Sequence, residues 1–596
     1  MKFYIGIDLG TTNSSVAYCS VDSESDRELK QYKVHQLVSE GLVDALDILP
    51  SNLYFPAEGE FSSEVLELPW GESGKYVIGE FAKRQASRAG YRVVHSAKSW
   101  LCQSGIDRKK GILPFQSGLD ELISPFEATV AILSHIRDSW NYDVLAGLFG
   151  EEADESFEFE NQKIVITVPA SFDPAARDLT MEAAKELGLE NLRLLEEPQA
   201  ALYSWLESRD SWRDELELDS KVLVCDVGGG TTDFSLISAD DEEGNLQLQR
   251  IAVGNHILLG GDNMDLALMV HLQNKLKESG QTPDAKQLES LKAQAREAKE
   301  KILGGEVASQ KLTLAGSGSS LFESSMEVEL DESDLENVVL DGFFSACSTK
   351  DKPKTRRLFG FRQAGLNYAQ DASILKHLAD FLSRQESGFE VPRYILFNGS
   401  MFRSEKLQNK VMDCLKSWAE ETGNEQEIEV LSTGDLPLAV SRGAGYYARV
   451  SEGDGIRIKA ALAYSLYIGI EKSQMAIPGV EPEIGLICVA PMGLEEGSSV
   501  EYKEEPLYLV TGEQVQFRLF RSPFRHDEVG TAIDFNEEEF EEISTLEKTL
   551  KEGNEEEFIP VHLATEVTEV GTMDLYCIAQ DQPDQKWQLE FHVRDQ

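Results

Sequence analysis

Two segments of the chain carry the same polar residues after the same kind of apolar run. Residues 4–18 read YIGIDLGTTNSSVAY, and residues 221–238 read KVLVCDVGGGTTDFSLIS. Each contains an aspartate, Asp8 or Asp226, followed by a turn rich in glycine and threonine. Glycine allows the backbone to approach an anion closely, and such a turn offers N–H groups and threonine hydroxyls as hydrogen-bond donors. These residue types in this order predict two anion-binding turns.

The elements that must position these turns are β-strands. Each turn lies between two β-rich segments, which predicts a hairpin in either copy. The strand-end aspartates Asp8 and Asp226 are suited to hold the water shell of Mg²⁺, an ion that takes few direct carboxylates. The second copy predicts two similar lobes, each contributing one turn to a shared cleft. We therefore predict a clamp for nucleotide phosphates in preference to two ordinary hairpins.

Further segments make the two turns part of a longer resemblance. IGIDLGTTNS and CDVGGGTTDFS resemble the two phosphate segments of the 70-kilodalton heat-shock (DnaK-type) chaperones, in the actin-like ATPase superfamily. The similarity runs in the same order over about residues 3–450. It includes ITVPASFDPAARDLTMEAAKELGLENLRLLEEPQAAL at 166–202, LLGGDNMD at 258–265, LFNGSMFRS at 396–404 and LPLAVSRGAGYYA at 436–448.

The resemblance implies roles for individual residues. Lys98 would orient the attacking water and neutralise γ-phosphate charge, Glu197 would share water and Mg²⁺ contacts, and Asp226 would orient the hydrolytic water. Asp8 and Asp226 would hold the metal through water, and Thr231 would join the catalytic group. Phosphoryl transfer needs such residue types because it depends on positioning and on cations beside the phosphate oxygens. The implied nucleotide-binding residues are Gly10, Thr11, Thr12, Asn13, Gly228, Gly229, Gly230, Thr231, Lys299, Gly399 and Ser400.

Residues 286–303 predict an amphipathic helix that departs from the family pattern. Its inward positions are Leu288, Leu291, Ala295, Ala298 and Ile302. The family presents Glu, Lys, Arg and Ser on such a helix to hold the ribose and stack on adenine, whereas this chain has Arg296, Lys299, Glu300 and Leu303. The acid and the arginine are exchanged. An equal alternative is a solvated face with an Arg296–Glu300 pair.

The late segment also departs from the family pattern. Gly399 and Ser400 match it, but Asn398 stands where the family has a glycine, and the expected arginine is displaced to Arg403. The sequence therefore supports phosphate binding better than it supports binding of the adenosine part of a nucleotide.

Composition limits the classes of function. The chain has 596 residues, with 105 acidic against 56 basic side chains and a net charge of −49, which argues against nucleic-acid and membrane-surface roles. With no long apolar run and no signal-peptide core, we expect a soluble cytoplasmic protein. The seven cysteines include no CxxC pair, and we expect Cys19, Cys225 and Cys488 to be buried small hydrophobes.

The predicted fold class is α/β, with a two-lobed actin-like ATPase domain followed by a β-sandwich-like domain. We place the nucleotide-binding domain at 1–452, with lobes at about 1–215 and 216–395 and a return to the first lobe by 435–450. Residues 458–596 read mostly as strands separated by turns and form the expected substrate- or partner-binding domain.

Three regions outside the motifs carry predictions of their own. The stretch 348–362 is basic and loop-like, and predicts a solvated excursion or a docking site for an acidic partner, followed by a helix in ASILKHLADFL. SEGDGIRIKAA at 451–461 stands where the family has an apolar linker. The acidic stretch 534–558 reads as a solvated loop or short helix, and we expect no helical lid.

The leading hypothesis is an ATP-binding, chaperone-like protein. It predicts slow Mg²⁺-dependent ATP hydrolysis, with ATP/ADP and Mg²⁺ as cofactors, coupled to a C-terminal domain that binds unfolded peptide or a partner protein. A co-chaperone or nucleotide-exchange partner would fit this role. The alternative is a non-catalytic interaction protein with a degenerate nucleotide site. A small-molecule kinase of the same superfamily is disfavoured by the DnaK-type segments and the β-rich end.

Overall fold

The computed structural model describes most of the chain, and the statements below concern that part. Among the described residues, no helix is both long and apolar enough to cross a membrane. Described are residues 2–589 apart from 22–27, 72–73, 104, 151–153, 210–214, 243–244, 316–324, 355–365, 386–387, 425, 452–461, 463, 472–483, 495–497, 512–513, 523–524, 537–538, 550–556, 568–572 and 583–584.

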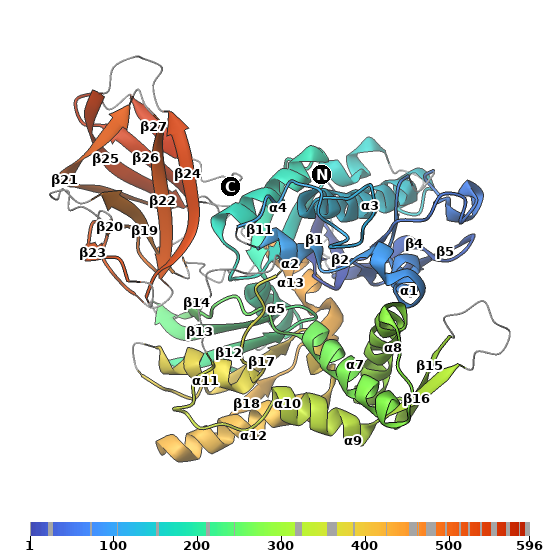
Figure 1. The fold of residues 1–596 in the computed structure, drawn as a ribbon. Coiled ribbons are helices and arrows are strands. Elements are labelled where there is room, and N and C mark those ends of the chain that lie inside the picture. Colours follow the sequence, from blue (N-terminus) through green and yellow to red (C-terminus); the bar gives the residue numbers. More distant parts are fainter. Residues whose placement is uncertain are drawn as a thin grey trace, which may run out of the picture.

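A mixed sheet carries the first glycine-rich turn at its centre (Figure 1). Its strands pair in the order β11–β10–β1–β2–β3, and β6 adds to β2. The pairs β1–β10 and β10–β11 are parallel, whereas β1–β2 and β2–β3 are antiparallel. The strands are β1 (Phe3–Leu9), β2 (Asn13–Ser20), β3 (Lys30–Tyr32), β6 (Leu49–Pro50), β10 (Lys163–Val168) and β11 (Leu192–Glu196).

A second sheet repeats this topology around the second turn. Its order is β18–β17–β12–β13–β14, with parallel pairs β12–β17 and β17–β18 and antiparallel pairs β12–β13 and β13–β14. Both predicted hairpins are present: Leu9 pairs with Ser14 in one, and Val227 with Thr232 in the other. The strands are β12 (Ser220–Val227), β13 (Thr232–Glu242), β14 (Asn245–Val253), β17 (Tyr394–Asn398) and β18 (Glu429–Leu431).

Helices cover both sheets and fill the space between them. Around the first sheet lie α1 (Glu80–Ala89), α2 (Ala97–Leu101), α3 (Pro125–Leu145), α4 (Pro174–Glu186), α5 (Glu197–Glu207) and α13 (Leu436–Val450). Around the second lie α7 (Gly261–Glu278), α8 (Ala285–Leu303), α11 (Ile374–Ser383) and α12 (Glu405–Thr422). The helices predicted at 286–303 and in ASILKHLADFL are thus confirmed as α8 and α11.

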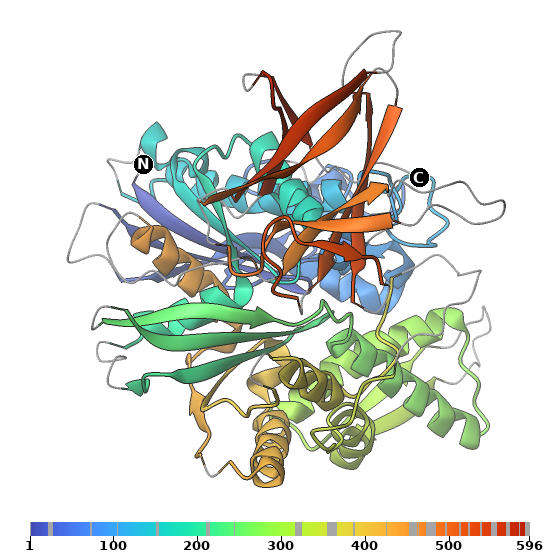
Figure 2. The same cartoon turned by 90° about the vertical axis from the view of Figure 1, so that its left-hand side faces the viewer.

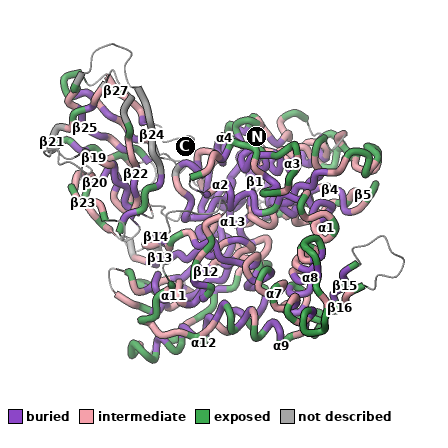
Figure 3. Tube along the Cα trace, viewed as in Figure 1, coloured by how far each residue is buried: buried purple, intermediate pink, exposed green. Residues whose placement is uncertain are grey.

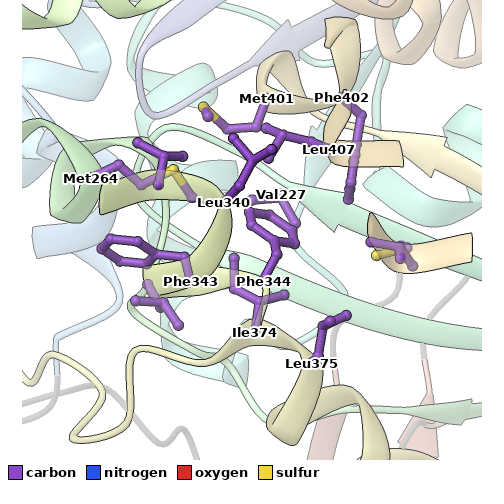
Figure 4. Close-up of a cluster of buried hydrophobic side chains, with 14 of the residues drawn as sticks. Val227, Met264, Leu340, Phe343, Phe344, Ile374, Leu375, Met401, Phe402 and Leu407 are labelled. Atoms are coloured by element: carbon purple, nitrogen blue, oxygen red, sulfur yellow. The ribbon is translucent and has the colours of Figure 1, made fainter. Parts of the chain in front are cut away.

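Separate cores support the two sheets, and a third joins them (Figure 3). The joining core combines residues of β1, β10, β12 and β17 with α5 and α13. Figure 4 shows the core below the second sheet, where Val227, the last residue of β12, lies near Met401 and Leu340. The strand end that carries Asp226 therefore rests on a rigid base.

Smaller elements complete this α/β part. They are β4 (Val34–Ser39), β5 (Leu42–Leu46), β7 (Leu53–Tyr54), β8 (Val77–Ile78), β9 (Val93–Val94), β15 (Ser309–Leu314), β16 (Met326–Asp331), α9 (Glu332–Leu335), α10 (Asp341–Phe343), the π-turn η6 (Glu336–Leu340), and the 3₁₀ turns η2 (Ser63–Leu66), η3 (Gly90–Arg92), η4 (Glu155–Phe157), η5 (Phe159–Asn161) and η7 (Ser400–Arg403).

The described residues after 463 form two antiparallel sheets around one apolar core. One has the order β23–β20–β19–β22–β24, and the other β21–β25–β26–β27. The strands are β19 (Ser465–Glu471), β20 (Ile484–Ala490), β21 (Ser499–Thr511), β22 (Gln514–Ser522), β23 (Ala532–Asp534), β24 (Glu541–Thr549), β25 (Glu557–Val567), β26 (Met573–Ala579) and β27 (Lys586–Leu589).

The prediction of a loop or short helix over 534–558 is wrong for residues 541–549, which form β24. The acidic side chains that suggested a solvated loop are paired across strands. Glu542 accepts from Arg518 on β22, and Glu541 accepts from Arg521, while Ile543 is buried. Opposite charges on neighbouring strands favour strand pairing. The composition of residues 534–558 does not show which arginines will lie opposite these glutamates.

The C-terminal sheets contact both halves of the α/β part. In Figures 1 and 2 the orange and red strands lie beside the green strands β13 and β14. Val253 of β14 and Ala170 belong to the same apolar core as Tyr464 and Leu466. The Arg521 guanidinium donates to the Ser171 carbonyl at 3.2 Å. Residues 452–461 of the predicted linker and residues 355–362 of the basic stretch at 348–362 lie outside the described residues.

Candidate functional site

The two glycine-rich loops face each other across the interface between the two sheets. The first loop is residues 10–12, between β1 and β2, and the second loop is residues 228–231, between β12 and β13. A Cβ added to Gly229 would overlap the Thr12 hydroxyl, and one added to Gly230 would lie 3.0 Å from a methyl carbon of Thr11. Side chains at these positions would fill the space between the loops, so glycine is required there.

Neighbouring elements fix the shape of each loop. The Ser51 amide donates to the carbonyl of Thr12, and its hydroxyl donates to the carbonyl of Gly10, both at 2.8 Å. On the other side, the first residues of α7 donate to the second loop: Gly261 N–H to Gly228 at 3.1 Å, and Asp262 N–H to Gly229 at 2.7 Å. The loops are therefore preorganised before any ligand binds.

A buried lysine and three acids lie beside the loops. Lys98, on α2, donates a hydrogen bond to Glu197, the first residue of α5; Lys98 is buried and Glu197 is partly buried. Burial disfavours the charge on Lys98, but Glu197 and Asp8 outweigh it and raise the lysine pKa. Burial, with repulsion from Glu197, raises the pKa of Asp8 to about 7. Burial and repulsion from Glu197 and Asp233 also raise the pKa of Asp226.

Raised carboxyl pKa values mark a place where negative charge lacks sufficient compensation. A bound cation would supply that compensation, so these acids fit Mg²⁺ held through its waters. Among the described residues, no three His, Cys, Asp or Glu side chains are grouped closely enough to chelate a metal directly. That donor set suits a hydrated ion, and the side chains of Thr12 and Thr11 lie directly against Gly229 and Gly230 of the second loop.

Residues 398–400, at the end of β17, lie against the end of β12. Gly399 has φ +87° and lies so close to Asp226 that an added Cβ would be 2.6 Å from its Oδ1. Ser400 begins η7 directly after it. Asn398, which departs from the family pattern, donates to Asp226 Oδ2 at 2.7 Å. Asn398 thus belongs to the site, and the sequence signal was its place at the end of a strand parallel to β12.

In helix α8, the partners of Arg296 differ from the expected Arg296–Glu300 pair. The structure does not give Arg296 the partner Glu300: its guanidinium donates to Asp265 at 2.5 Å and to Asp262, both on α7. Lys299 is buried and pairs with Asp265 at 2.6 Å. The predicted face is therefore not solvated at these positions, because α7 packs its acids against α8. Glu300 is exposed.

A second buried charge network lies behind the second loop and was not found from the sequence. Ser171 donates to Asp233 Oδ1 at 2.5 Å, and His256 Nδ1 lies 2.7 Å from the Ser171 hydroxyl. Burial alone would lower the pKa of His256, but Asp233 outweighs it and raises that pKa to about 10. Despite burial, His256 also lowers the pKa of Asp233. The imidazolium and carboxylate are thus both charged at neutral pH.

This network predicts a pH dependence of stability. Because folding raises the pKa of His256, its contribution is full below about pH 6.5 and is lost as the pH rises toward 10. The free energy of unfolding should fall over this range, with a slope from this group of at most about 1.4 kcal/mol per pH unit. Urea unfolding at pH 7, 8 and 9 should give a steeper decrease for the wild type than for His256→Asn. Equal slopes would contradict the assignment.

Several of the residues predicted for the site lie close together in the structure. The structure brings the two loops together with Lys98, Glu197, Asp8 and Asp226, and it adds Asn398. Gly399 and Ser400 follow β17 at the same edge. Lys299 lies under α7 with its ammonium engaged by Asp265 and by the Gly261 carbonyl at 3.2 Å. Cys19, Cys225 and Cys488 are buried, as predicted.

Comparison with known proteins identifies the central part of the chain. A family model described as "Hsp70 protein" matches residues 71–347, which include Lys98, Glu197 and the second loop. "Chaperone protein DnaK" of Thermosipho africanus (strain TCF52B) is 30% identical over 277 residues, 46% of this chain and 36% of that protein. "Chaperone protein DnaK" of Thermotoga maritima is 31% identical over 277 residues, 46% of this chain and 37% of that protein.

The match is narrower than the resemblance at 3–450, since the first loop and the segments after 347 lie outside it. The chain spans little more than a third of the length of the curated relatives it matches. The mixed α/β fold, with its repeated sheets and facing loops, agrees with the matched segment. Residues 71–347 of this chain are therefore similar to the Hsp70 family.

Proposed function

We propose that the protein binds ATP and ADP with Mg²⁺ between the two loops and hydrolyses ATP slowly. The observation that carries this proposal is the pair of facing loops, with the Lys98–Glu197 ion pair and two under-compensated aspartates beside them. Nucleotide phosphates bring negative charge and a hydrated metal, which match the loop donors and the acids respectively. The similarity to the Hsp70 family and to DnaK chaperones supports this class of function.

The chain's residues would divide the chemistry as follows. Backbone N–H groups of the loops and the hydroxyls of Thr11, Thr12 and Thr231 would bind phosphate oxygens. Lys98 would offset negative charge on the transferred group and hold the attacking water, with Glu197 fixing its ammonium. Asp226, oriented by Asn398, would accept a hydrogen bond from that water. When bound, Mg²⁺ would supply further charge stabilisation through waters on Asp8 and Asp226.

The domain arrangement is part of the same proposal. Residues 1–452 would form the nucleotide-binding domain, and 458–596 a β-sandwich that binds unfolded peptide or a partner protein, with a co-chaperone or exchange partner acting on the first. Two antiparallel sheets around one core support the sandwich. The contact of Arg521 and Tyr464 with residues 170–172 supports communication between the parts. We propose a cytoplasmic location.

One observation favours the second candidate, a non-catalytic interaction protein. The charged residues of α8 pair with the acids of α7 rather than remaining available to a ribose or an adenine base. These ion pairs between α7 and α8 would weaken the binding of a nucleoside and leave the two loops unchanged. The C-terminal sheets would then bind partners without a nucleotide cycle.

Isothermal titration calorimetry of the full chain with ATP and with ADP, each with and without Mg²⁺, separates the candidates. We expect saturable heat for both nucleotides, weakened by at least about tenfold when EDTA replaces Mg²⁺, because the acids then repel the phosphates. A thermal-shift titration serves as the independent readout. No heat and no shift with either nucleotide would refute the proposal and favour the non-catalytic protein.

A further inference from the structure

Ser96 has an unusual backbone for its position. It precedes α2, the five-residue helix that carries Lys98, and its φ of 56° lies in the left-handed region that serine rarely adopts. A serine before a helix ordinarily caps it through its side chain. Here Ser96 makes no such cap. Strained residues of this kind persist where surrounding structure holds them for another purpose.

The Ser96 hydroxyl instead reaches the opposite lobe. It donates to Asp262 Oδ2 at 2.9 Å. Asp262 lies in the first turn of α7, and its own N–H donates to Gly229 in the second loop at 2.7 Å. One side chain therefore connects the start of the Lys98 helix to the element that supports the second loop.

The acceptor is itself held firmly. Arg296 of α8 donates to both Asp262 and Asp265, so the Asp262 carboxylate has a fixed orientation. Burial disfavours its charge, but Arg296 outweighs burial and lowers the pKa of Asp262. The exposed neighbour His95 lies with its Nδ1 3.3 Å from the Ser96 hydroxyl. A charged acceptor strengthens the hydrogen bond from Ser96.

The backbone of Ser96 sets the direction of α2. Its carbonyl accepts from the amides of Ser99 at 3.0 Å and Trp100 at 3.4 Å. Lys98 lies between Ser96 and Ser99 in this turn, and its ammonium donates to Glu197. A shift of Ser96 would therefore tilt the helix and move Lys98 relative to the second loop.

We propose that Ser96 and Asp262, with Arg296 behind them, are positioning residues that fix Lys98 against the second loop across the cleft. The hydrogen bond forms only when the two lobes are close, so it couples lobe closure to the placement of Lys98. The part of this inference that concerns catalysis, the placement of Lys98 for hydrolysis, rests on the proposed ATPase function. The mechanical link between α2 and α7 stands independently of it.

Three substitutions at one position test the link in the full chain. Ser96→Gly removes the donor and relieves the left-handed backbone, Ser96→Ala removes the donor only, and Ser96→Asn tolerates the backbone and restores an N–H donor. We expect Gly and Ala to lower kcat for ATP about 5- to 20-fold with KM changed less than 2-fold, and Asn to recover much of the loss. Ser134→Ala removes a serine that donates to Asp138 at 3.2 Å within α3, and should leave kcat unchanged.

Amide hydrogen exchange without nucleotide provides the second readout. A peptide covering residues 95–103 should exchange at least about 5-fold faster in Ser96→Gly and in Asp262→Ala, with no further increase in the double variant, because both break the same bond. Wild-type kcat and exchange in Ser96→Gly would overturn the inference, since a merely structural serine would be replaced by glycine without loss. If the wild type proves inactive, the proposed function fails, and the exchange data alone decide the link.

Discussion

Lys98→Ala should lower the rate of Mg²⁺-dependent ATP hydrolysis by at least about 10² to 10³-fold, while nucleotide binding persists. The loss is large because the buried ammonium of Lys98 is the cation that the structure places beside Glu197, Asp8 and the loops. Removing a preorganised charge from a water-poor site costs this much in related electrostatic catalysis. Single-turnover hydrolysis with excess protein, compared with calorimetric affinity for ATP, measures the two effects separately.

Lys109→Ala is the matched control for this experiment. Lys109 also pairs with a glutamate, Glu182 at 2.6 Å, but on the exposed surface, so its loss should change neither rate nor affinity. Asp226→Ala should abolish hydrolysis as Lys98→Ala does, because it removes the carboxylate proposed to orient the water. A Lys98→Ala protein that is folded, by its thermal unfolding, and as active as the wild type would refute the catalytic assignment.

Gly443→Ala should reduce the free energy of unfolding by about 3 kcal/mol or more. Gly443 lies where α13 crosses α5, and an added Cβ would overlap the carbonyl of Ala200 and lie 2.9 Å from the amide of Ser204. Both neighbours are backbone atoms, so a rotamer change gives no relief and the helices must move apart. This crossing belongs to the core that joins the two sheets, so the separation would loosen the lobe interface.

Gly342→Ala provides the comparison. Gly342 is exposed on α10, and the only atom within 4 Å of an added Cβ among the described residues is the Asn337 carbonyl oxygen at 3.9 Å. Alanine should be neutral there or stabilise by up to about 1 kcal/mol, because it restricts the unfolded chain. Urea unfolding of both variants measures the difference. A Gly443→Ala protein within 1 kcal/mol of the wild type would contradict the close-packed crossing.

The repeated hairpins could be predicted because their signals are local. Glycines, threonines and a strand-end aspartate occur within a few residues, and apolar, β-rich runs mark the strands that precede both turns. The same holds for α8, whose inward positions follow the helical period and are buried at Leu291, Ala295, Ala298 and Ile302. The hairpins and the buried face of α8 depend on residues that are close together in the chain, so a single sequence is enough to predict them.

The pairing partners of charged side chains could not be predicted in the same way. Arg296 has Glu300 one turn away on its own helix, yet it binds Asp262 and Asp265 on α7. The strand β24 was missed because its glutamates find arginines on β22, about twenty residues earlier. The network of His256, Asp233 and Ser171 joins three separate segments.

Local residue order therefore specified the two loops, their strands and the acids at the strand ends, since backbone conformation and glycine content are set within a few residues. Packing of segments distant in sequence specified which groups meet: Ser96 with Asp262, Asn398 with Asp226, and Gly443 with Ala200. The physical reason is that a charge or a hydroxyl can reach any of several nearby partners. Its choice depends on burial and on the approach of whole elements, which only the assembled core establishes.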